Sequence, residues 1–394
     1  MVHAMNAARS CKRYDEVALV LQGGGALGSY QAGVVEGLGE AGIEPSWVAG
    51  ISIGAINAAI IAGNAPDQRT RRLEAFWQRI CRQPGSPGAC TLPQALPMPE
   101  AMRTGMAAMA SWRALTEGQN GFFWPRFAPP VLPGTGSAQS ASWYDTAALR
   151  ETLEHFVDFD RLNHPSAMRV SVGAVQVATG NMRYFDNRRE RLGPEHFMAS
   201  GALPPGFPAV VVDDEAYWDG GLVSNTPLLE VLRSGRPDTD LLVFQVDLWG
   251  ARGAVPTSLI EVSDRQKDIQ YSSRTRMVTD LMGREIEHRR QVSALLALLP
   301  PEHRQRPLAR RAARFASPRR CNVIHLIYQR RPREGLTRDF EFSARTMRMH
   351  WREGLDDARR TLRHPQWLVL PDEDSPFVTH DIHRRVPAAL PAAP

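Results

Sequence analysis

The chain has 394 residues, a formal net charge of +5, a hydrophobic fraction of 43% and a charged fraction of 23%. These values are ordinary for folded proteins and exclude a wholly disordered chain, a collagen and a small disulfide-bonded domain. No apolar run approaches the length of about 18 residues that a transmembrane helix needs, and the early apolar run 17–21 is too short for a signal peptide.

The first eighty residues alternate apolar runs with helical patterns. After a polar leader at 1–14, which we expect to be flexible, residues 16–21 predict a buried strand that runs into a glycine cluster. The next expected elements are a helix over 30–41, a strand over 47–51, a helix over 53–62 and a helix over 71–80. This order predicts parallel strands and an α/β fold.

A segment rich in proline and glycine, residues 83–142, then interrupts the pattern. Met102, Met106, Met109 and Trp112 recur at helical spacing, and three aromatic residues follow at 122–124. The stripe is compatible with a lid or lipid-facing cap over an apolar site. Because such stripes are usually core, we interpret it as packing against the body of the protein.

The remaining elements extend the α/β pattern into a helical C-terminal part. We expect a helix over 146–157, a hairpin of 169–177 with 183–185, a rigid loop at 199–208, short strands at 209–212 and 217–218, and strands at 241–246 and 323–328. Helices are expected over much of 260–299 and over 342–362, where Met347, Trp351, Leu355, Ala358 and Leu362 share one face. The Ala/Pro tail 386–394 is expected to be disordered.

The charge is unevenly distributed along the chain. Residues 301–333 hold ten arginines and one acid, Glu302, and so carry +9, which leaves −4 for the rest. Such a segment is either a solvated surface or a contact for an anionic membrane, a phosphate group or nucleic acid. No zinc-finger, helix-turn-helix or RNA-binding signature is present, so we expect no nucleic-acid partner.

The cysteines indicate a reducing compartment. Cys11, Cys81, Cys90 and Cys321 form no C-x-x-C pair and no cluster with metal-ligand spacing. We therefore expect reduced thiols, no metal site, and a cytoplasmic protein for which peripheral contact with a membrane stays open.

Gly50-Ile51-Ser52-Ile53-Gly54 lies where the second strand is expected to meet the second helix. This is the context of a G-x-S-x-G nucleophile elbow, in which small neighbours tolerate a strained serine raised above the sheet. The start of the following helix stabilises negative charge near that serine. Ser52 is therefore the candidate nucleophile.

Gly23-Gly24-Gly25-Ala26-Leu27-Gly28 follows the first strand. Its N–H groups suit a phosphate or the oxyanion of an acyl transfer. A dinucleotide site would need an acid at the end of the second strand, where the chain has Ala49-Gly50-Ile51-Ser52 instead. A Walker A motif is excluded because no Gly-Lys-Ser/Thr follows.

Asp219-Gly220-Gly221 provides a candidate base. By itself Asp-Gly is a common turn signal, but a serine nucleophile needs a base. The conventional order Ser…Asp/Glu…His would use His325, His350 or His364. None of these follows a strand in a Gly-rich loop, so a Ser-His-Asp esterase is the less favoured alternative.

Together these motifs resemble the patatin-like phospholipase family. The resemblance covers about 17–231 and includes the glycine motif, the serine motif, the Asp-Gly-Gly motif and the block Ala199-Ser200-Gly201-Ala202-Leu203-Pro204 with Phe207-Pro208. Many members have Arg or Lys where this chain has Leu27. The part after about 235 resembles an extension of some bacterial members.

The resemblance implies a three-layer α/β/α fold with a mostly parallel sheet and a largely helical C-terminal extension. It implies a lipid acyl hydrolase with a Ser52–Asp219 dyad and no cofactor, and an acyl ester such as a phospholipid as substrate. A non-catalytic lipid-binding module is the other alternative. The expected organisation is a leader at 1–14, a hydrolase domain at 15–232, an extension at 233–385 and the tail 386–394.

Overall fold

The structure is a computed structural model that describes residues 2–81, 100–132, 134, 136–272, 275–330 and 337–383. Cys90 and the tail 386–394 lie outside this part. The strands are β1 (Glu16–Leu21), β2 (Trp47–Ile51), β3 (Trp124–Pro125), β4 (Tyr144–Asp145), β5 (Arg169–Gln176), β6 (Met182–Asp186), β7 (Val210–Val212), β8 (Glu215–Asp219), β9 (Leu241–Asp247), β10 (Cys321–Ile327) and β11 (Phe377–Asp381).

Helices connect most of these strands. The α-helices are α1 (Val2–Cys11), α2 (Ser29–Glu40), α3 (Ile53–Ala62), α4 (Arg69–Ile80), α5 (Glu100–Glu117), α6 (Ala147–Phe156), α7 (Phe159–Leu162), α8 (Pro194–Ser200), α9 (Leu228–Ser234), α10 (Leu259–Tyr271), α11 (Thr275–Leu298), α12 (Pro301–Arg304), α13 (Pro307–Ala313) and α14 (Ala344–Thr361). Short 3-10 turns are η1 (Gly25–Gly28), η2 (Pro66–Gln68), η3 (Gly220–Leu222), η4 (Arg338–Phe340) and η5 (Pro365–Leu368).

A nine-stranded, mostly parallel sheet forms the centre of the molecule. Its order is β11-β10-β9-β1-β2-β5-β8-β7, with β6 also paired to β5. The six strands from β11 to β5 are parallel, and β6, β7 and β8 run antiparallel to their neighbours. The predicted α/β class is confirmed.

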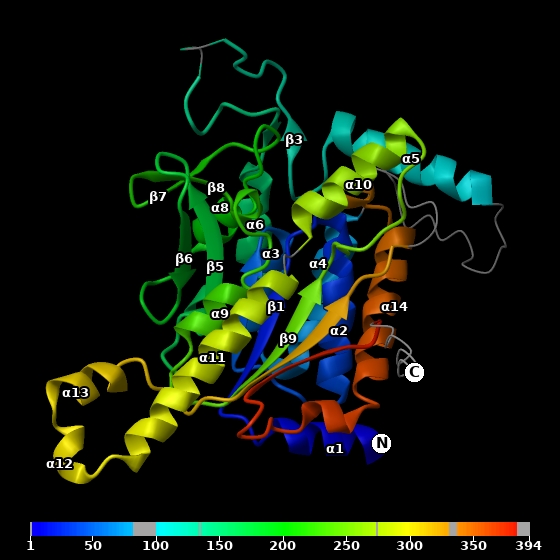
Figure 1. Ribbon diagram of the computed structural model, residues 1–394. Coiled ribbons are helices and arrows are strands. Elements are labelled where there is room, and N and C mark those ends of the chain that lie inside the picture. Colours follow the sequence, from blue (N-terminus) through cyan, green and yellow to red (C-terminus); the bar gives the residue numbers. More distant parts are fainter. Residues whose placement is uncertain are drawn as a thin grey trace.

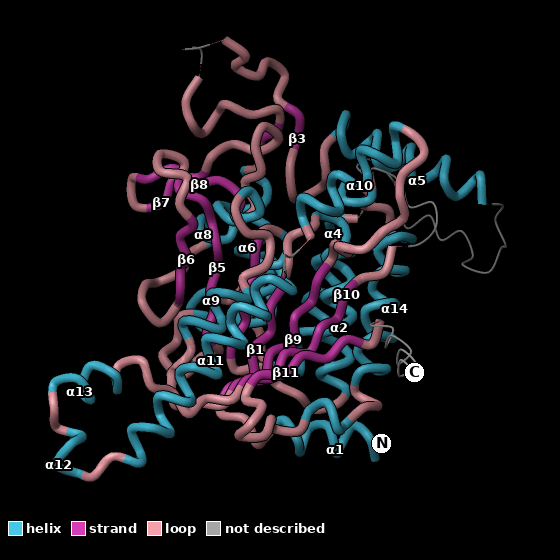
Figure 2. Tube along the Cα trace, viewed as in Figure 1, coloured by secondary structure: helices cyan, strands magenta, loops and turns pink. Residues whose placement is uncertain are grey.

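Helices cover both faces of this sheet. Alternate residues of β1 point to opposite sides: Leu19 and Leu21 pack with α2, α3 and α14, whereas Ala18 and Val20 pack with α9 and α11. Figures 1 and 2 show α9 and α11 in front of the sheet and α2, α4 and α14 behind it. The result is the predicted three-layer arrangement.

Two segments differ from their expected structure. The leader, expected to be flexible, contains helix α1, and Cys11 at its end is buried in the core. Strand β9, predicted at 241–246, lies beside β1 in the middle of the sheet, although it belongs to the part expected to be a largely helical extension packed on the core. The described residues after 233 thus supply three strands of the central sheet, β9, β10 and β11, as well as helices.

The insertion also differs from its interpretation. Phe122 and Phe123 are buried as expected, but Met106, Met109 and Trp112 on α5 are exposed, and the small residues Ser111 and Ala114 are buried instead. The interpretation of this stripe as core is therefore wrong. Within the described residues, no helix combines the length and apolar character needed to cross a bilayer.

Candidate active site

The serine motif forms a sharp turn between β2 and α3. Ser52 has φ 55° and ψ −124°, in the left-handed region that a side chain rarely occupies. The turn requires small neighbours, since a Cβ on Gly50 would lie 2.4 Å from the carbonyl oxygen of Gly54, and one on Gly54 would lie 2.4 Å from that of Leu21. Ile51 and Ile53, which flank the serine, are buried. This is the strained conformation expected of a nucleophile elbow.

Ser200 supports this turn from α8. Its hydroxyl accepts a hydrogen bond from the N–H of Ser52 at 2.9 Å and donates one to the carbonyl of Gly173 at 2.6 Å. The elbow is therefore tied to strand β5. No role for Ser200 was predicted from the sequence beyond its place in the Pro-rich block.

The sheet register brings Asp219 level with Ser52. Ile51 on β2 pairs with Gly173 on β5, and the next residue of β5, Ala174, pairs with Asp219 on β8. Close packing at Gly220, where a Cβ would lie 2.6 Å from the carbonyl oxygen of Gly173, keeps the end of β8 against β5. Two motifs 167 residues apart thus meet across one strand.

Asp219 is buried, with 2% of its surface exposed. Burial raises the pKa of its carboxyl to about 6, although the neighbouring Ser52 side chain and the N–H of Gly221 oppose that rise. The N–H of Gly221 donates to Oδ1 of Asp219 at 2.7 Å. The carboxyl is therefore a stronger base than an exposed aspartate.

The glycine motif forms the tight turn η1 directly beside Ser52. Gly25 has φ +56°, and a Cβ there would lie 2.3 Å from the carbonyl oxygen of Asp339. The N–H groups that open such a turn have no acceptor within it, which leaves those of Gly24, Gly25 and Ala26 as candidate oxyanion donors. Gly23 differs, because its N–H already donates to the carbonyl of Asn225 at 3.1 Å.

The last residues of the glycine motif have packing roles. Gly28 lies against α3, where a Cβ would meet Ile53 at 2.6 Å. The side chain of Leu27, at the position where many family members carry a basic residue, is fully buried in the core. The turn is thus held by packing rather than by a charged side chain at that position.

Asn225 and Trp249 hold the glycine turn in place. The carbonyl of Gly23 accepts hydrogen bonds from Nδ2 of Asn225 at 3.0 Å and from Nε1 of Trp249 at 2.9 Å. Nδ2 of Asn225 also donates to the carbonyl of Tyr271, at 2.9 Å. Neither residue was predicted from the sequence, because neither belongs to a motif.

These groups line a pocket that encloses about 700 Å³, part of it open to solvent. Its polar end contains Ser52, Asp219, Gly221, Asn225 and the glycine turn. The remaining wall is mainly apolar and comprises Ile53, Ile56, Phe122, Phe123, Leu203, Phe207, Trp249, Tyr271, Phe340 and Phe342. A small reactive end joined to a long apolar wall suits an acyl ester.

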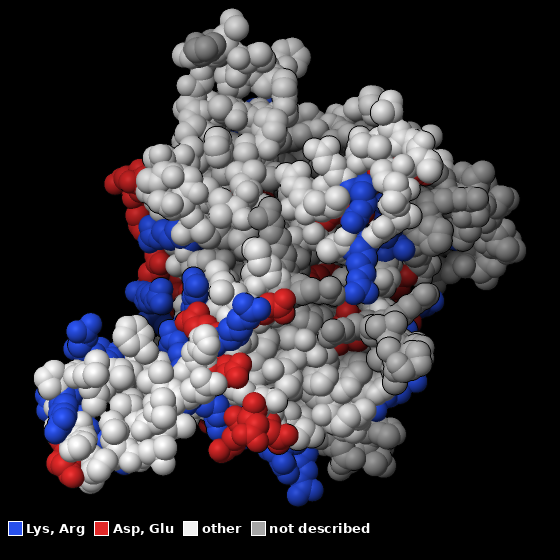
Figure 3. Space-filling view, in the orientation of Figure 1, with Lys and Arg blue, Asp and Glu red and all other residues white. Residues whose placement is uncertain are grey.

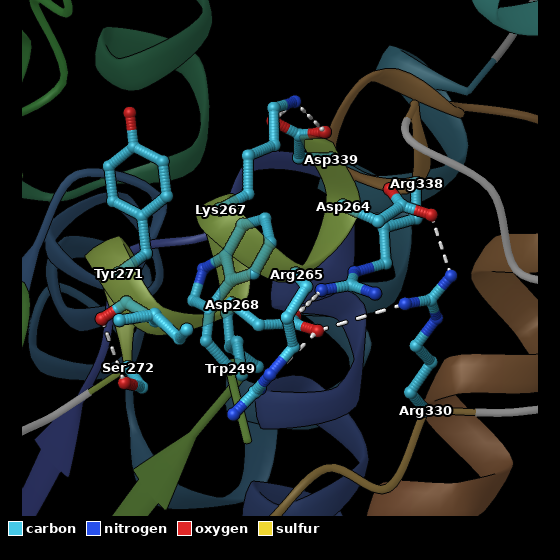
Figure 4. A network of polar contacts seen from close by, with 12 residues as sticks. Trp249, Asp264, Arg265, Lys267, Asp268, Tyr271, Ser272, Arg330, Arg338 and Asp339 are labelled. Carbon is cyan, nitrogen blue, oxygen red and sulfur yellow. Dashed lines mark hydrogen bonds and ion pairs between the residues drawn. The ribbon is translucent and has the colours of Figure 1, made fainter. Parts of the chain in front are cut away.

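A strap of residues 337–342 closes one side of the pocket with Asp339, Phe340 and Phe342. Figure 4 shows how α10 holds it: Lys267 pairs with Asp339 at 3.0 Å, and Arg338 pairs with Asp268. The Arg338 guanidinium also lies 4.7 Å from the ring centre of Trp249, the residue that donates to Gly23. The strap therefore connects α10 with the glycine turn.

No described histidine lines this pocket. His325 is on the buried strand β10, His350 packs edge-on against Tyr328, and His364 stacks on Trp367. The described residues also contain no group of three or more His, Cys, Asp or Glu side chains placed to hold a metal ion. The geometry brings together Ser52, Asp219 and the glycine turn without any of the three histidines.

Comparisons with known proteins agree with the motifs. A family profile described as patatin-like phospholipase matches residues 19–232, and one described as patatin phospholipase matches residues 269–374. A cGAMP-activated phospholipase of Escherichia coli (strain TW11681) is 33% identical over 118 residues, which cover 26% of this chain and 33% of that protein. The chain thus matches about one third of that relative's length.

A more distant likeness is to the crystal structure of VipD from Legionella pneumophila, with 14% identity and a TM-score of 0.38. That match covers 88% of this chain and 67% of the VipD chain. The two profiles span the site at 19–232 and most of the C-terminal part. The chain therefore belongs to the patatin-like phospholipase family.

Proposed function

We propose that the protein is a lipid acyl hydrolase that uses Ser52 as nucleophile and Asp219 as general base. The observation that carries this proposal is the sheet register, which places the buried carboxyl of Asp219 level with Ser52, held at φ 55°, in the wall of one pocket. A serine in a strained turn beside a carboxylate of raised pKa has the geometry and the basicity that acyl transfer needs.

The proposed reaction has two steps. Asp219 takes the proton of Ser52 as Oγ bonds to the ester carbonyl carbon, and the oxyanion accepts hydrogen bonds from the N–H groups of Gly24, Gly25 and Ala26. The C–O bond to the alcohol breaks, Asp219 returns the proton to that alcohol, and an acyl-Ser52 intermediate remains. Water then attacks this ester with Asp219 again as base, the bond from Ser52 Oγ to the acyl carbon breaks, and Asp219 returns the proton to Oγ as the carboxylic acid leaves.

The apolar wall supports a substrate with a long acyl chain. No lysine or arginine is among the described residues that line the pocket, and its two acids are Asp219 and Asp339. The proposed substrates are therefore phospholipid, lysophospholipid or neutral acyl esters that enter the pocket with the acyl chain first.

The proposal also includes contact of the arginine-rich segment 301–333 with anionic lipid. In Figure 1, α12 and α13 of this segment lie at the corner of the molecule farthest from β3 and α10. Attraction at that corner would be sensitive to salt. It would concentrate the protein near an anionic surface without itself delivering the ester to Ser52.

Hydrolysis of a short p-nitrophenyl ester tests the dyad. Ser52→Ala and Asp219→Asn should each reduce kcat by at least about 1,000-fold, because each removes a partner of the proton transfer. Far-ultraviolet circular dichroism and thermal unfolding check that both variants remain folded. Near-wild-type activity in either folded variant refutes the dyad.

A further inference from the structure

Helix α10 has its polar face turned toward the protein and its apolar face toward solvent. Asp264 and Asp268, four residues apart, are buried against Arg330 and Arg338. Leu259, Val262 and Ile269 share the opposite side of the helix with Gln266, and all four are exposed. Because a surface helix normally buries its apolar stripe, this orientation needs a separate explanation.

The ion pairs explain why α10 is oriented in this way. Asp264 and Asp268 cannot face water unless their ion pairs with Arg330 and Arg338 break. Arg338, which belongs to the strap, is only 6% exposed. Figure 4 shows Asp264 and Asp268 directed toward Arg330 and Arg338. The cost of separating buried charge pairs thus holds the apolar stripe outside.

Helix α5 repeats this arrangement on the same strap. It buries Ser111 and Ala114 and exposes Met109 and Trp112. The hydroxyl of Ser111 lies 3.5 Å from the carbonyl oxygen of Thr337, its acceptor at the start of the strap. Two helices with exposed apolar faces are therefore fixed to the segment that closes one side of the pocket.

A third apolar element extends from the same end of the molecule. The loop that follows β3 carries Phe127, which is fully exposed, only four residues after the pocket residue Phe123. Figures 1 and 2 show this loop, α5 and α10 together at the end where the parallel strands terminate. In Figure 3 that loop has hardly any charged side chains in view, whereas Lys and Arg lie on the corner with α12 and α13 and also beside α10.

We propose that these exposed side chains form a surface that docks on a lipid bilayer. This apolar rim consists of Met109 and Trp112 on α5, Phe127 after β3, and Leu259, Val262 and Ile269 on α10. The inference rests on the proposed lipid substrate, because an apolar path from the bilayer to the pocket lowers the free energy of transfer only for a substrate with an apolar chain. Docking lets an acyl chain leave the bilayer and reach Ser52 with little exposure to water.

The position of the rim favours a bilayer over a protein partner. The strap links the rim to the apolar pocket wall, since α5 and α10 hold the strap and the strap supplies Phe340 and Phe342 to that wall. A protein seated on the rim would cover the approach to the pocket. A bilayer on the same rim supplies the substrate, and apolar burial there does not depend on charged headgroups.

Vesicle binding by the Ser52→Ala protein tests the rim without hydrolysis of the lipid. Sedimentation with phosphatidylcholine vesicles at about 0.5 M salt screens the contribution of the arginine-rich segment. The double variant Leu259→Gln/Ile269→Gln, called the rim pair, should weaken partitioning into vesicles at least about tenfold, because two apolar side chains no longer enter the lipid. Trp112→Gln should weaken it in the same direction.

The matched control is the pair Leu298→Gln and Leu308→Gln. These leucines are 80% and 78% exposed and lie on α11 and α13, away from the rim. This control should bind vesicles like the parent protein. Equal binding by the rim pair and the parent overturns the proposal, as does a dimer of the parent in sedimentation equilibrium that the rim pair dissociates.

Hydrolysis of a soluble short ester separates this inference from the proposed function. With Ser52 present, the rim pair should cleave the soluble ester at the wild-type rate, because neither Leu259 nor Ile269 lines the pocket. Its hydrolysis of vesicle lipid should fall in proportion to its weaker binding to vesicles. If the wild type binds vesicles through the rim but cleaves neither substrate, the hydrolase proposal fails and docking stands.

Discussion

Ser200 holds Ser52 in place through its hydroxyl, which accepts from the N–H of Ser52 at 2.9 Å and donates to Gly173 at 2.6 Å. Because Ser200 is fully buried, its loss leaves one N–H and one carbonyl unpaired in the interior. The nucleophile then loses the contact that fixes its turn to β5.

Ser200→Ala should therefore lower kcat by about 10- to 100-fold, since small displacements of a nucleophile are costly. It should also reduce the free energy of unfolding by about 1–3 kcal/mol. Steady-state hydrolysis and urea unfolding measure the two effects. Ser200→Thr, which keeps the hydroxyl, should recover part of kcat, and a fully active, equally stable alanine variant would contradict this role.

The raised pKa of Asp219 predicts how the rate depends on pH. Only the ionised carboxyl can accept the Ser52 proton, so kcat/KM should rise with pH, reach half its maximum near the pKa of about 6, and level off above it. The slope below the midpoint should approach tenfold per pH unit. Initial rates in buffers of constant ionic strength give this profile.

A histidine base would give a similar profile, because the ordinary pKa of an imidazole, about 6.5, is close to the value of about 6 for Asp219. Histidine variants distinguish the two bases. His325→Gln, His350→Gln and His364→Gln, where folded, should keep the wild-type midpoint and plateau. Loss of activity in one folded variant would favour a Ser-His-Asp mechanism instead.

Gly25 should be intolerant of even a methyl group. Its φ of +56° disfavours a side chain, and a Cβ would lie 2.3 Å from the backbone oxygen of Asp339. Gly25→Ala should therefore move the glycine turn and lower kcat by about 100-fold, the range seen when one oxyanion donor is lost.

Gly39 on α2 provides the matched control for that substitution. A Cβ there meets nothing within 4 Å, so Gly39→Ala should keep full activity and add up to about 1 kcal/mol of stability through helix propensity. Unchanged kcat in Gly25→Ala would show that the turn does not position the oxyanion donors.

The buried ion pair of Arg338 with Asp268 should contribute far more to the free energy of unfolding than an exposed ion pair does. Arg338→Ala leaves Asp268 without its nearest partner in the interior, so the free energy of unfolding should fall by about 3 kcal/mol. Arg359→Ala removes an exposed pair with Glu40 at 2.8 Å and should cost less than about 1 kcal/mol. Urea unfolding of both variants makes the comparison, and equal losses would contradict it.

The sequence predicted the parts of the site that local patterns encode. The glycine and serine motifs require unusual backbone conformations, so their residue types reveal them, and the strands next to them were predicted correctly. Asn225 could not be found in this way, because it contacts Gly23 across 202 positions and belongs to no pattern. The same holds for Ser200, whose bond to Ser52 spans 148 positions.

The orientation of α5 and α10 shows why the rest could not be predicted. An apolar stripe normally indicates the buried face, and that rule placed Met106, Met109 and Trp112 in the core. Here the faces are set by distant partners, since Asp268 meets Arg338 across 70 positions. Helix α1 in the leader could not be predicted for a similar reason: α1 contacts η5, which lies near the other end of the chain.

Mapping of a covalent fluorophosphonate adduct tests the central claim most directly. The probe reacts with an activated serine, and its phosphorus mimics the tetrahedral carbon, so peptide mass spectrometry identifies the nucleophile. The proposed mechanism predicts one adduct, on Ser52, that is nearly absent in Asp219→Asn. An adduct on a different residue, or esterase activity in a protein whose Ser52 stays unlabelled, would contradict it.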